Sequence, residues 1–167
     1  MSDNEFRSGF VCLVGRPNAG KSTLTNRIIG RKIAITSDRP QTTRRTVRGV
    51  LTRSDAQLIV VDTPGLHKPR TLLGERLNDL VRATWTEVDV IGFCLAANEE
   101  TGPGDRKLAA ELASIQRGPI IAVITKTDTA SPDEVAARLA SISELAAEVG
   151  LKVSEYVPVS AVTGDNV

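Results

Sequence analysis

The chain has 167 residues, of which 41% are hydrophobic and 25% charged, and its formal net charge is +1. These values are typical of one globular domain, and they exclude a disordered tail, a fibre and a multidomain enzyme. The charge is unevenly spread: residues 1–60 hold 11 Lys and Arg against 4 Asp and Glu, so an anionic ligand is expected to bind in this N-terminal third.

Apolar, β-branched runs alternate with helical patterns along the chain, which predicts an α/β fold with a mostly parallel sheet. The expected strands are Phe10–Val14, Thr46–Leu51, Gln57–Val61, Val90–Ala96, Pro119–Ile124 and Tyr156–Val159. Only residues 52–56 separate the second strand from the third, which is too short for a helical crossover. These two strands are therefore expected to form an antiparallel hairpin at an edge of the sheet.

Four helices are expected between the strands, over Thr23–Ile29, Leu72–Thr86, Asp105–Gln116 and Pro132–Val149. The last has the clearest signals, because Ser131 is a good N-cap, Glu134 completes a capping box and Gly150 ends the helix. Its expected buried stripe is Val135, Leu139, Ile142, Ala146 and Val149. The corresponding face of the second helix is Leu73, Leu77, Leu80 and Thr84.

A phosphate-binding loop follows the first strand, where residues 15–22 read GRPNAGKS and lead into a helix. Its glycines let backbone N–H groups point at a phosphate, Lys21 can neutralise the phosphate oxygens, and Ser22 can offer a hydroxyl to Mg²⁺. The expected phosphate-binding residues are Gly15, Asn18, Ala19, Gly20, Lys21, Ser22 and Thr23. The motif predicts a nucleotide ligand, but it does not select the base.

The sequence DTPG follows the strand Gln57–Val61. Asp62 can bind Mg²⁺ through a water, and Gly65 has no side chain to keep its N–H from a γ-phosphate. By itself this sequence is an ordinary turn. Its place after a phosphate-binding loop, at the end of a strand, favours a metal and phosphate role.

A base-binding site is predicted where TKTD, residues 125–128, follows the strand Pro119–Ile124. The Asp128 carboxylate can accept hydrogen bonds from N1–H and the 2-amino group of guanine, whereas adenine presents neither donor. The stem of Lys126 can cover the base, and the backbone N–H of Ala161, after Ser160, can reach the guanine O6. The motifs in this order predict a guanine nucleotide.

The two cysteines, Cys12 and Cys94, lie inside apolar runs, which favours buried free thiols in a reducing compartment over a disulfide or a zinc site. No run of about 18 apolar residues is present, and the N-terminus is polar and acidic. A cytoplasmic protein without a transmembrane segment is predicted.

Five segments together resemble the translation-factor-related GTPases and, within them, the Era-type bacterial GTPases. They are GRPNAGKST (15–23), ITSDRPQTTRR (35–45), DTPGLH (62–67), TKTD (125–128) and PVSAVTG (158–164). The resemblance covers nearly the whole chain and implies the Ras-like three-layer sandwich of P-loop NTPases, with one antiparallel edge strand. It also implies GTP or GDP and Mg²⁺ as ligands. The first switch of the family would place a Mg²⁺-binding hydroxyl on Thr43, with Thr42 as the alternative, and the second switch would run from Gly65 to about Leu72.

The resemblance further implies a GTP-hydrolysing switch in assembly of the small ribosomal subunit and maturation of 16S rRNA. In the family, RNA is bound mainly by a KH domain. This chain ends at Val167, so residues 1–167 are expected to form a GTP-binding domain without its final helix and without that KH domain. Peripheral membrane association is a further family property.

Two residues depart from the family pattern. Thr125 stands where the base motif usually has Asn, and guanine selection is expected to depend on Asp128. Leu66 stands where Ras-like proteins have the Gln that orients the attacking water, so slow turnover without an activator is expected. Several relatives with Asn in the phosphate loop use K⁺ at the position of an arginine finger, and a K⁺ held by Asn18 and the first switch is the hypothesis here. The expected catalytic residues are Lys21, Thr43, Gly65 and Asn18, and the expected Mg²⁺ ligands are Ser22, Thr43 and Asp62.

Two other functions are open at this point. A P-loop kinase would explain the phosphate loop but not Asp128, Ser160 and Ala161. A guanine-nucleotide binding module without hydrolysis is compatible with Leu66.

A cluster of arginines around the first switch and the edge hairpin also has two interpretations. It is either solvated surface or a contact with RNA or with the substrate phosphates. It consists of Arg39, Arg44, Arg45, Arg48 and Arg53.

Overall fold

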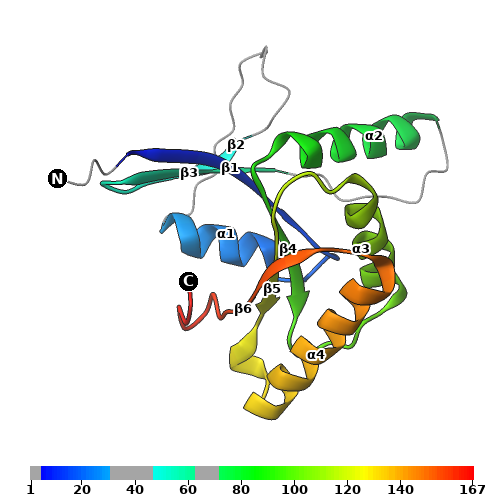
Figure 1. The fold of residues 1–167 in the computed structure, drawn as a ribbon. Helices are drawn as coiled ribbons and strands as arrows, with labels where there is room; N and C mark the ends of the chain where they lie inside the picture. Colours follow the sequence, from blue (N-terminus) through cyan, green and yellow to red (C-terminus); the bar gives the residue numbers. More distant parts are fainter. Residues whose placement is uncertain (1–4, 31–46, 63–71) are drawn as a thin grey trace.

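The computed structural model describes residues 5–30, 47–62 and 72–167, and the side chains of residues 72–77 are not described. Six strands form one sheet in the order β2-β3-β1-β4-β5-β6 (Figure 1). The strands are β1 (Arg7–Val14), β2 (Val47–Thr52), β3 (Ala56–Val61), β4 (Val90–Ala96), β5 (Ile120–Thr125) and β6 (Val153–Pro158). All neighbouring strands are parallel except the β2-β3 hairpin, which confirms the predicted antiparallel edge.

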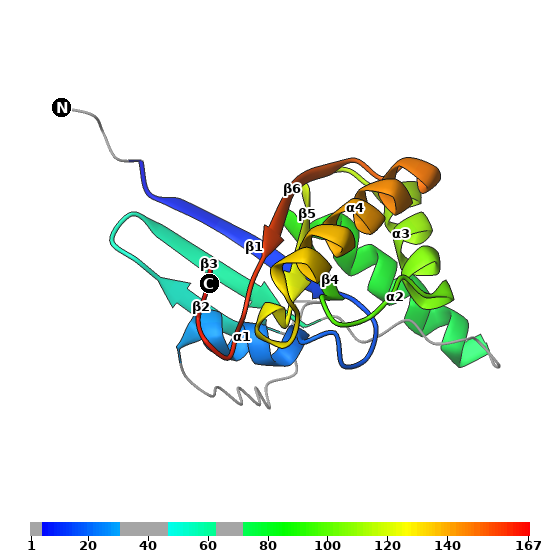
Figure 2. The same ribbon diagram turned by 90° about the horizontal axis from the view of Figure 1, so that it is seen from below.

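Helices cover both faces of the sheet. They are α1 (Lys21–Ile29), α2 (Leu72–Glu87), α3 (Pro103–Ile115), α4 (Pro132–Val149) and a single 3₁₀ turn, η1 (Thr127–Thr129). Figures 1 and 2 show α2, α3 and α4 on one face and α1 on the other. Because successive strand residues point to opposite faces, Phe93 of β4 packs with Leu112 and Ile142, whereas Cys94 packs with Leu24. The three-layer α/β sandwich predicted from the sequence is confirmed.

The edge strand β6 differs from its prediction. It spans Val153–Pro158 rather than Tyr156–Val159, because Val153 pairs with Ile120 and Glu155 with Ile121. An edge strand has one side exposed to solvent, so polar residues such as Ser154 can be part of it. The apolar pattern detected only its C-terminal part.

The predicted buried face of α2 is wrong in part. Leu80 is 47% exposed, whereas Val81 and Trp85, four residues apart, are 1% and 4% exposed. Trp85 has a larger apolar surface than Leu80, so its burial removes more apolar area from water. Thr84 is buried as predicted, and its hydroxyl donates to the Leu80 carbonyl oxygen at 3.0 Å.

The predicted signals of α4 are confirmed. The backbone N–H of Glu134 donates to the Ser131 hydroxyl at 3.3 Å, the N–H of Ser131 donates to the Glu134 carboxylate at 2.7 Å, and Gly150 ends the helix with φ of 73°. Ile142 and Ala146 are buried, as the periodicity predicted. Arg138 is also buried, which the apolar pattern could not predict.

An apolar groove lies on the face of the sheet that carries α1. Its lining includes Leu13, Val123 and Val157 from the sheet, Ile28 from α1, and Val167. The C-terminal residues and α1 lie on the same side of the sheet in both ribbon views (Figures 1 and 2). This face is therefore less covered by helices than the opposite one.

Cys12 and Cys94 are buried free thiols, as expected from their apolar surroundings. Burial raises the pKa of each thiol to about 12, so neither forms a reactive thiolate near neutral pH. Among the described residues, none of the helices combines the length and apolar character needed to cross a membrane.

Candidate functional site

The backbone conformation of the loop between β1 and α1 requires glycine or asparagine at particular positions. A Cβ atom on Gly15 would lie 2.5 Å from the carbonyl oxygen of Cys94, so β4 leaves room for glycine only. Gly20 has φ of 85° and Asn18 has φ of 65°, the left-handed conformation that glycine and asparagine adopt most readily. These conformations curl the loop into a concave backbone, of the kind that binds anions with its N–H groups.

The N-terminus of α1 adds a positive end to this loop. Its N-cap, Gly20, makes no side-chain capping hydrogen bond, and its first turn contains no acidic residue. The first N–H groups of a helix have no partner within the helix and carry partial positive charge. The loop and helix together form an anion site beside Ser22 and Thr23, which are exposed.

Lys21 lies inside the curl of the loop. Its ammonium group donates to the carbonyl oxygens of Gly15 and Arg16, both at 2.8 Å. Two of its three N–H groups are used in this way, which leaves one for an anionic ligand. Partial burial lowers the pKa of Lys21, and a bound phosphate would offset that desolvation.

A small pocket brings the two described metal-ligand candidates together. Ser22 at the start of α1 and Asp62 after β3 line it, along with Lys21 and Thr25. Hydroxyl and carboxylate oxygens are ligands that Mg²⁺ prefers, so these residues fit that ion. Arg48 of β2 also lines the pocket, with its Nε 3.2 Å from an Asp62 carboxylate oxygen. Thr43, its alternative Thr42, and Gly65 lie outside the described residues.

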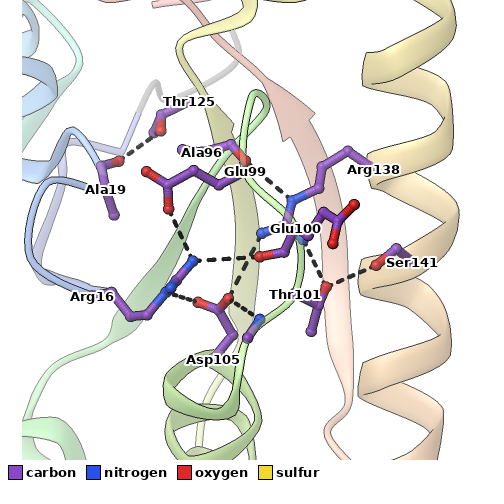
Figure 3. Close-up of polar contacts among 12 residues, drawn as sticks. Arg16, Ala19, Ala96, Glu99, Glu100, Thr101, Asp105, Thr125, Arg138 and Ser141 are labelled. Carbon is purple, nitrogen blue, oxygen red and sulfur yellow. Dashed lines mark hydrogen bonds and ion pairs between the residues drawn. The ribbon is translucent and has the colours of Figure 1, made fainter.

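Thr125 connects the predicted base site to the phosphate loop. Its buried hydroxyl donates to the carbonyl oxygen of Ala19 at 2.6 Å (Figure 3). A Cβ atom on Gly20 would lie 3.3 Å from Thr125 Oγ1, so the two segments are in close contact. Thr125 thus links the predicted base site directly to the phosphate loop.

Asp128 is held by a serine from another loop. The hydroxyl of Ser160, which is fully buried after β6, donates to Asp128 Oδ1 at 2.6 Å and accepts from the N–H of Thr163 at 3.1 Å. Lys126, with φ of 59°, makes the turn that leads from β5 to Asp128. The structure therefore places Asp128 beside Ser160 and Ala161. Sequence reasoning included Ser160 among the candidate nucleotide-binding residues, but it did not predict the hydrogen bond of the Ser160 side chain to Asp128.

A second feature missed by sequence reasoning is the side chain of Arg16. It extends from the phosphate loop to Asp105 in the first turn of α3 and to Glu99 in the β4-α3 connection, and it forms an ion pair with each (Figure 3). Its sequence signal is weak, because the partners lie more than 80 residues away and no local pattern connects them.

Comparison with known proteins identifies the family of this chain. A family profile described as 50S ribosome-binding GTPase matches residues 10–126. GTPase Era of Streptomyces coelicolor is 64% identical over 161 residues, which cover 96% of this chain and 51% of that protein. GTPase Era of a Nocardioides species is 63% identical over 161 residues, with the same coverage. The chain thus spans about half the length of these curated relatives.

Solved structures give the same result. A crystal structure of Era in complex with MgGDPNP and nucleotides 1506–1542 of 16S ribosomal RNA has a TM-score of 0.76 and 35% identity, over 97% of this chain and 54% of that chain. A variant of Aquifex aeolicus Era bound to GDP·AlF4⁻ has a TM-score of 0.73 and 35% identity, over 95% and 53%. The profile covers most of β1, all of β2 to β5, the phosphate loop and the DTPG segment. Because it describes GTPases, it does not favour the kinase alternative. As the resemblance to Era-type GTPases predicted, the chain belongs to the 50S ribosome-binding GTPase family.

Proposed function

We propose that this chain binds GTP with Mg²⁺ and hydrolyses it to GDP and phosphate, as a molecular switch. The observation that carries the proposal is the meeting of three loops at the carboxyl ends of β1, β5 and β6. Thr125 bonds to Ala19, and Ser160 bonds to Asp128, so the phosphate loop and the base-binding residues form one connected site. Ligands of open α/β sheets bind at this end of the strands.

The proposed reaction is in-line attack of water on the γ-phosphorus, with GDP as the leaving group. Lys21 and the N–H groups at the start of α1 hold the β- and γ-phosphates and stabilise the negative charge that develops there. Ser22 and Asp62 are the described residues that would hold Mg²⁺, which neutralises phosphate charge when it is bound. Since Leu66 occupies the position after DTPG, no glutamine is present there to orient the water, and unassisted turnover is expected to be slow.

The first test is competition binding of GTP, GDP, ATP and xanthosine triphosphate to the chain with Mg²⁺ present. We expect micromolar affinity for GTP and GDP and none of comparable strength for ATP. Equal ATP binding would support the kinase alternative, and the absence of all binding would contradict the proposal. Single-turnover hydrolysis of bound GTP then separates a GTPase from a module that only binds.

Potassium dependence is a separate prediction for Asn18. This residue is exposed on the loop with φ of 65°, and we propose that it helps to hold K⁺ where an arginine finger acts in other GTPases. Phosphate release by the wild type is expected to be about tenfold faster in KCl than in NaCl at equal ionic strength, since a cation there stabilises transition-state charge. Asn18→Ala is expected to lose this difference. Equal wild-type rates in both salts would rule out the K⁺ role.

The cellular role that we propose is in assembly of the small ribosomal subunit, with 16S rRNA as a partner. Its support is the set of relatives named GTPase Era and the solved Era complex that contains 16S ribosomal RNA. Among the arginines of the predicted cluster, Arg48 pairs with Asp62 and Arg53 lines the apolar groove. Arg39, Arg44 and Arg45 lie outside the described residues. A cytoplasmic location is part of the proposal, and it agrees with the two buried cysteines, neither of which forms a disulfide among the described residues.

We also propose that residues 1–167 are the GTP-binding domain of an Era-type protein, without the final helix and the RNA-binding KH domain that the family resemblance implies. Two observations support this. The chain corresponds to 51% of the Streptomyces coelicolor relative. The apolar groove beside α1 offers a surface on which a further helix can pack.

A further inference from the structure

The side chain of Arg16 points away from the concave side of the phosphate loop. Its Nε donates to Asp105 Oδ1 at 2.9 Å, and one terminal nitrogen donates to Glu99 Oε2, also at 2.9 Å (Figure 3). The same nitrogen lies 3.4 Å from the carbonyl oxygen of Glu100. The guanidinium is therefore engaged by the β4-α3 connection and the first turn of α3, and is not directed at the phosphate site.

The partner of Arg16 on α3 is a buried carboxylate. Asp105 is 1% exposed, and its Oδ2 accepts from the N–H of Gly102 at 3.0 Å and lies 3.9 Å from a terminal nitrogen of Arg138. A buried charge is costly unless charged partners and hydrogen bonds compensate it. Asp105 has both, so its charge is compensated in this buried position.

Arg138 of α4 fixes this connection from the other side. Its Nε donates to the carbonyl oxygen of Ala96 at 3.1 Å, and another of its nitrogens donates to the Thr101 hydroxyl at 2.6 Å. Thr101 is in turn 2.8 Å from the Ser141 hydroxyl, also on α4 (Figure 3). Hydrogen bonds thus hold the β4-α3 connection at Ala96, at Thr101 and at Gly102. The connection in turn holds the groups that bind the Arg16 side chain.

Two glycines make room for the Arg16 stem. A Cβ atom on Gly104 would lie 2.8 Å from Arg16 Cδ, and one on Gly102 would lie 3.3 Å from a terminal nitrogen of Arg16. The sequence TGPGD, residues 101–105, therefore combines two glycines, against which the Arg16 side chain lies, with the Asp105 carboxylate that pairs with it.

The backbone of Arg16 is at the same time part of the phosphate loop. Its carbonyl oxygen accepts from the Lys21 ammonium at 2.8 Å and from the N–H of Ala19 at 3.2 Å. Arg16 thus joins Asp105, through its side chain, to Lys21, through its carbonyl group. A shift of Arg16 would change the position of the lysine that the proposed function assigns to the phosphates.

We propose that Arg16 and Asp105 are positioning residues, whose ion pair fixes the phosphate loop against α3 so that Lys21 is held in place for the nucleotide phosphates. This inference rests on the proposed nucleotide-binding function. A direct role for Arg16, in which its guanidinium itself binds phosphate, makes the opposite prediction. Loss of the ion pair with Asp105 would then leave nucleotide affinity undiminished.

The test is a double-mutant cycle in GDP affinity and GDP dissociation rate, with Arg16→Gln, Asp105→Asn and the double variant. Asp105→Asn keeps the side-chain oxygen that accepts from Gly102. Each single variant is expected to bind GDP about tenfold more weakly, because a charged hydrogen bond that orders the loop is lost. The double variant is expected to be no weaker than either single one. GTP affinity should fall by the same factor, since GDP and GTP share the β-phosphate.

Glu111→Gln is the matched control. Glu111 lies on α3 as well, and its carboxylate pairs with Arg82 of α2 at 3.0 Å. Its loss is expected to leave GDP affinity unchanged, with thermal unfolding followed in parallel for every variant. An equal loss of affinity in Glu111→Gln would mean a general effect of weakening α3 and would overturn the inference.

Other outcomes are equally decisive. A loss in Arg16→Gln without a loss in Asp105→Asn would assign Arg16 a direct role and overturn the positioning role. Failure of the wild type to bind GDP would contradict the proposed function itself, which is a different result. If Asp105→Asn does not fold, Glu99→Gln replaces it in the cycle, because Glu99 is a second partner of Arg16 and its side chain is 38% exposed. The cycle must then again show a loss shared with Arg16→Gln, and additive losses would overturn the inference.

Discussion

Asp128→Asn is expected to change the preferred ligand of this chain from GTP to xanthosine triphosphate, with a change in relative affinity of about a thousandfold or more. The Asp128 carboxylate only accepts hydrogen bonds, and it matches the N1–H and 2-amino donors of guanine. Xanthine has a carbonyl group at C2, to which the asparagine amide can donate. Ser160 can keep its hydrogen bond, because the amide oxygen of asparagine accepts as the Asp128 carboxylate does at 2.6 Å.

Competition binding of GTP and xanthosine triphosphate to the wild type and the variant measures this change. Asp133→Asn is the matched control, because Asp133 is an exposed acidic residue in the first turn of α4 and makes the same charge change nearby. It is expected to keep the preference for GTP. Guanine preference retained in Asp128→Asn would show that Asp128 does not select the base.

Lys21→Ala is expected to abolish nucleotide binding, with GDP and GTP affinities lowered by about a thousandfold or more, or about 4 kcal/mol. Two effects add. The phosphates lose a charged donor, and the carbonyl oxygens of Gly15 and Arg16 lose the ammonium that bonds to both at 2.8 Å. The second effect changes the loop itself, so added Mg²⁺ should not restore binding.

The Lys21→Ala result is measured as GDP affinity, with thermal unfolding to show that the variant is folded. Lys107→Ala serves as the control, since Lys107 is an exposed lysine on α3 away from the phosphate loop. It is expected to bind GDP like the wild type. Micromolar GDP affinity in Lys21→Ala would remove the lysine from the phosphate site.

Features that depend on near neighbours in the chain could be predicted from the sequence. The caps of α4 at Ser131 and Gly150 are local, as is the short connection that makes β2 and β3 antiparallel. The phosphate loop is also local, because its glycines, Lys21 and Ser22 lie within eight consecutive residues. Resemblance to a family then added Thr43 and Gly65, which lie outside the described residues and stay predictions.

Tertiary structure decided the features that join distant segments. Ser160 bonds to Asp128 across 32 residues, Thr125 to Ala19 across 106, and Arg16 to Asp105 across 89. The buried face of α2 is another such feature, because Val81 and Trp85 are buried whereas Leu80 of the predicted face is exposed. Hydrogen bonds and packing of this kind depend on distances between side chains in the folded chain, and residue spacing carries no information about them. The sequence by itself thus determined the fold and the type of ligand that we propose, and only the tertiary structure decided which side chains hold the predicted binding residues in position.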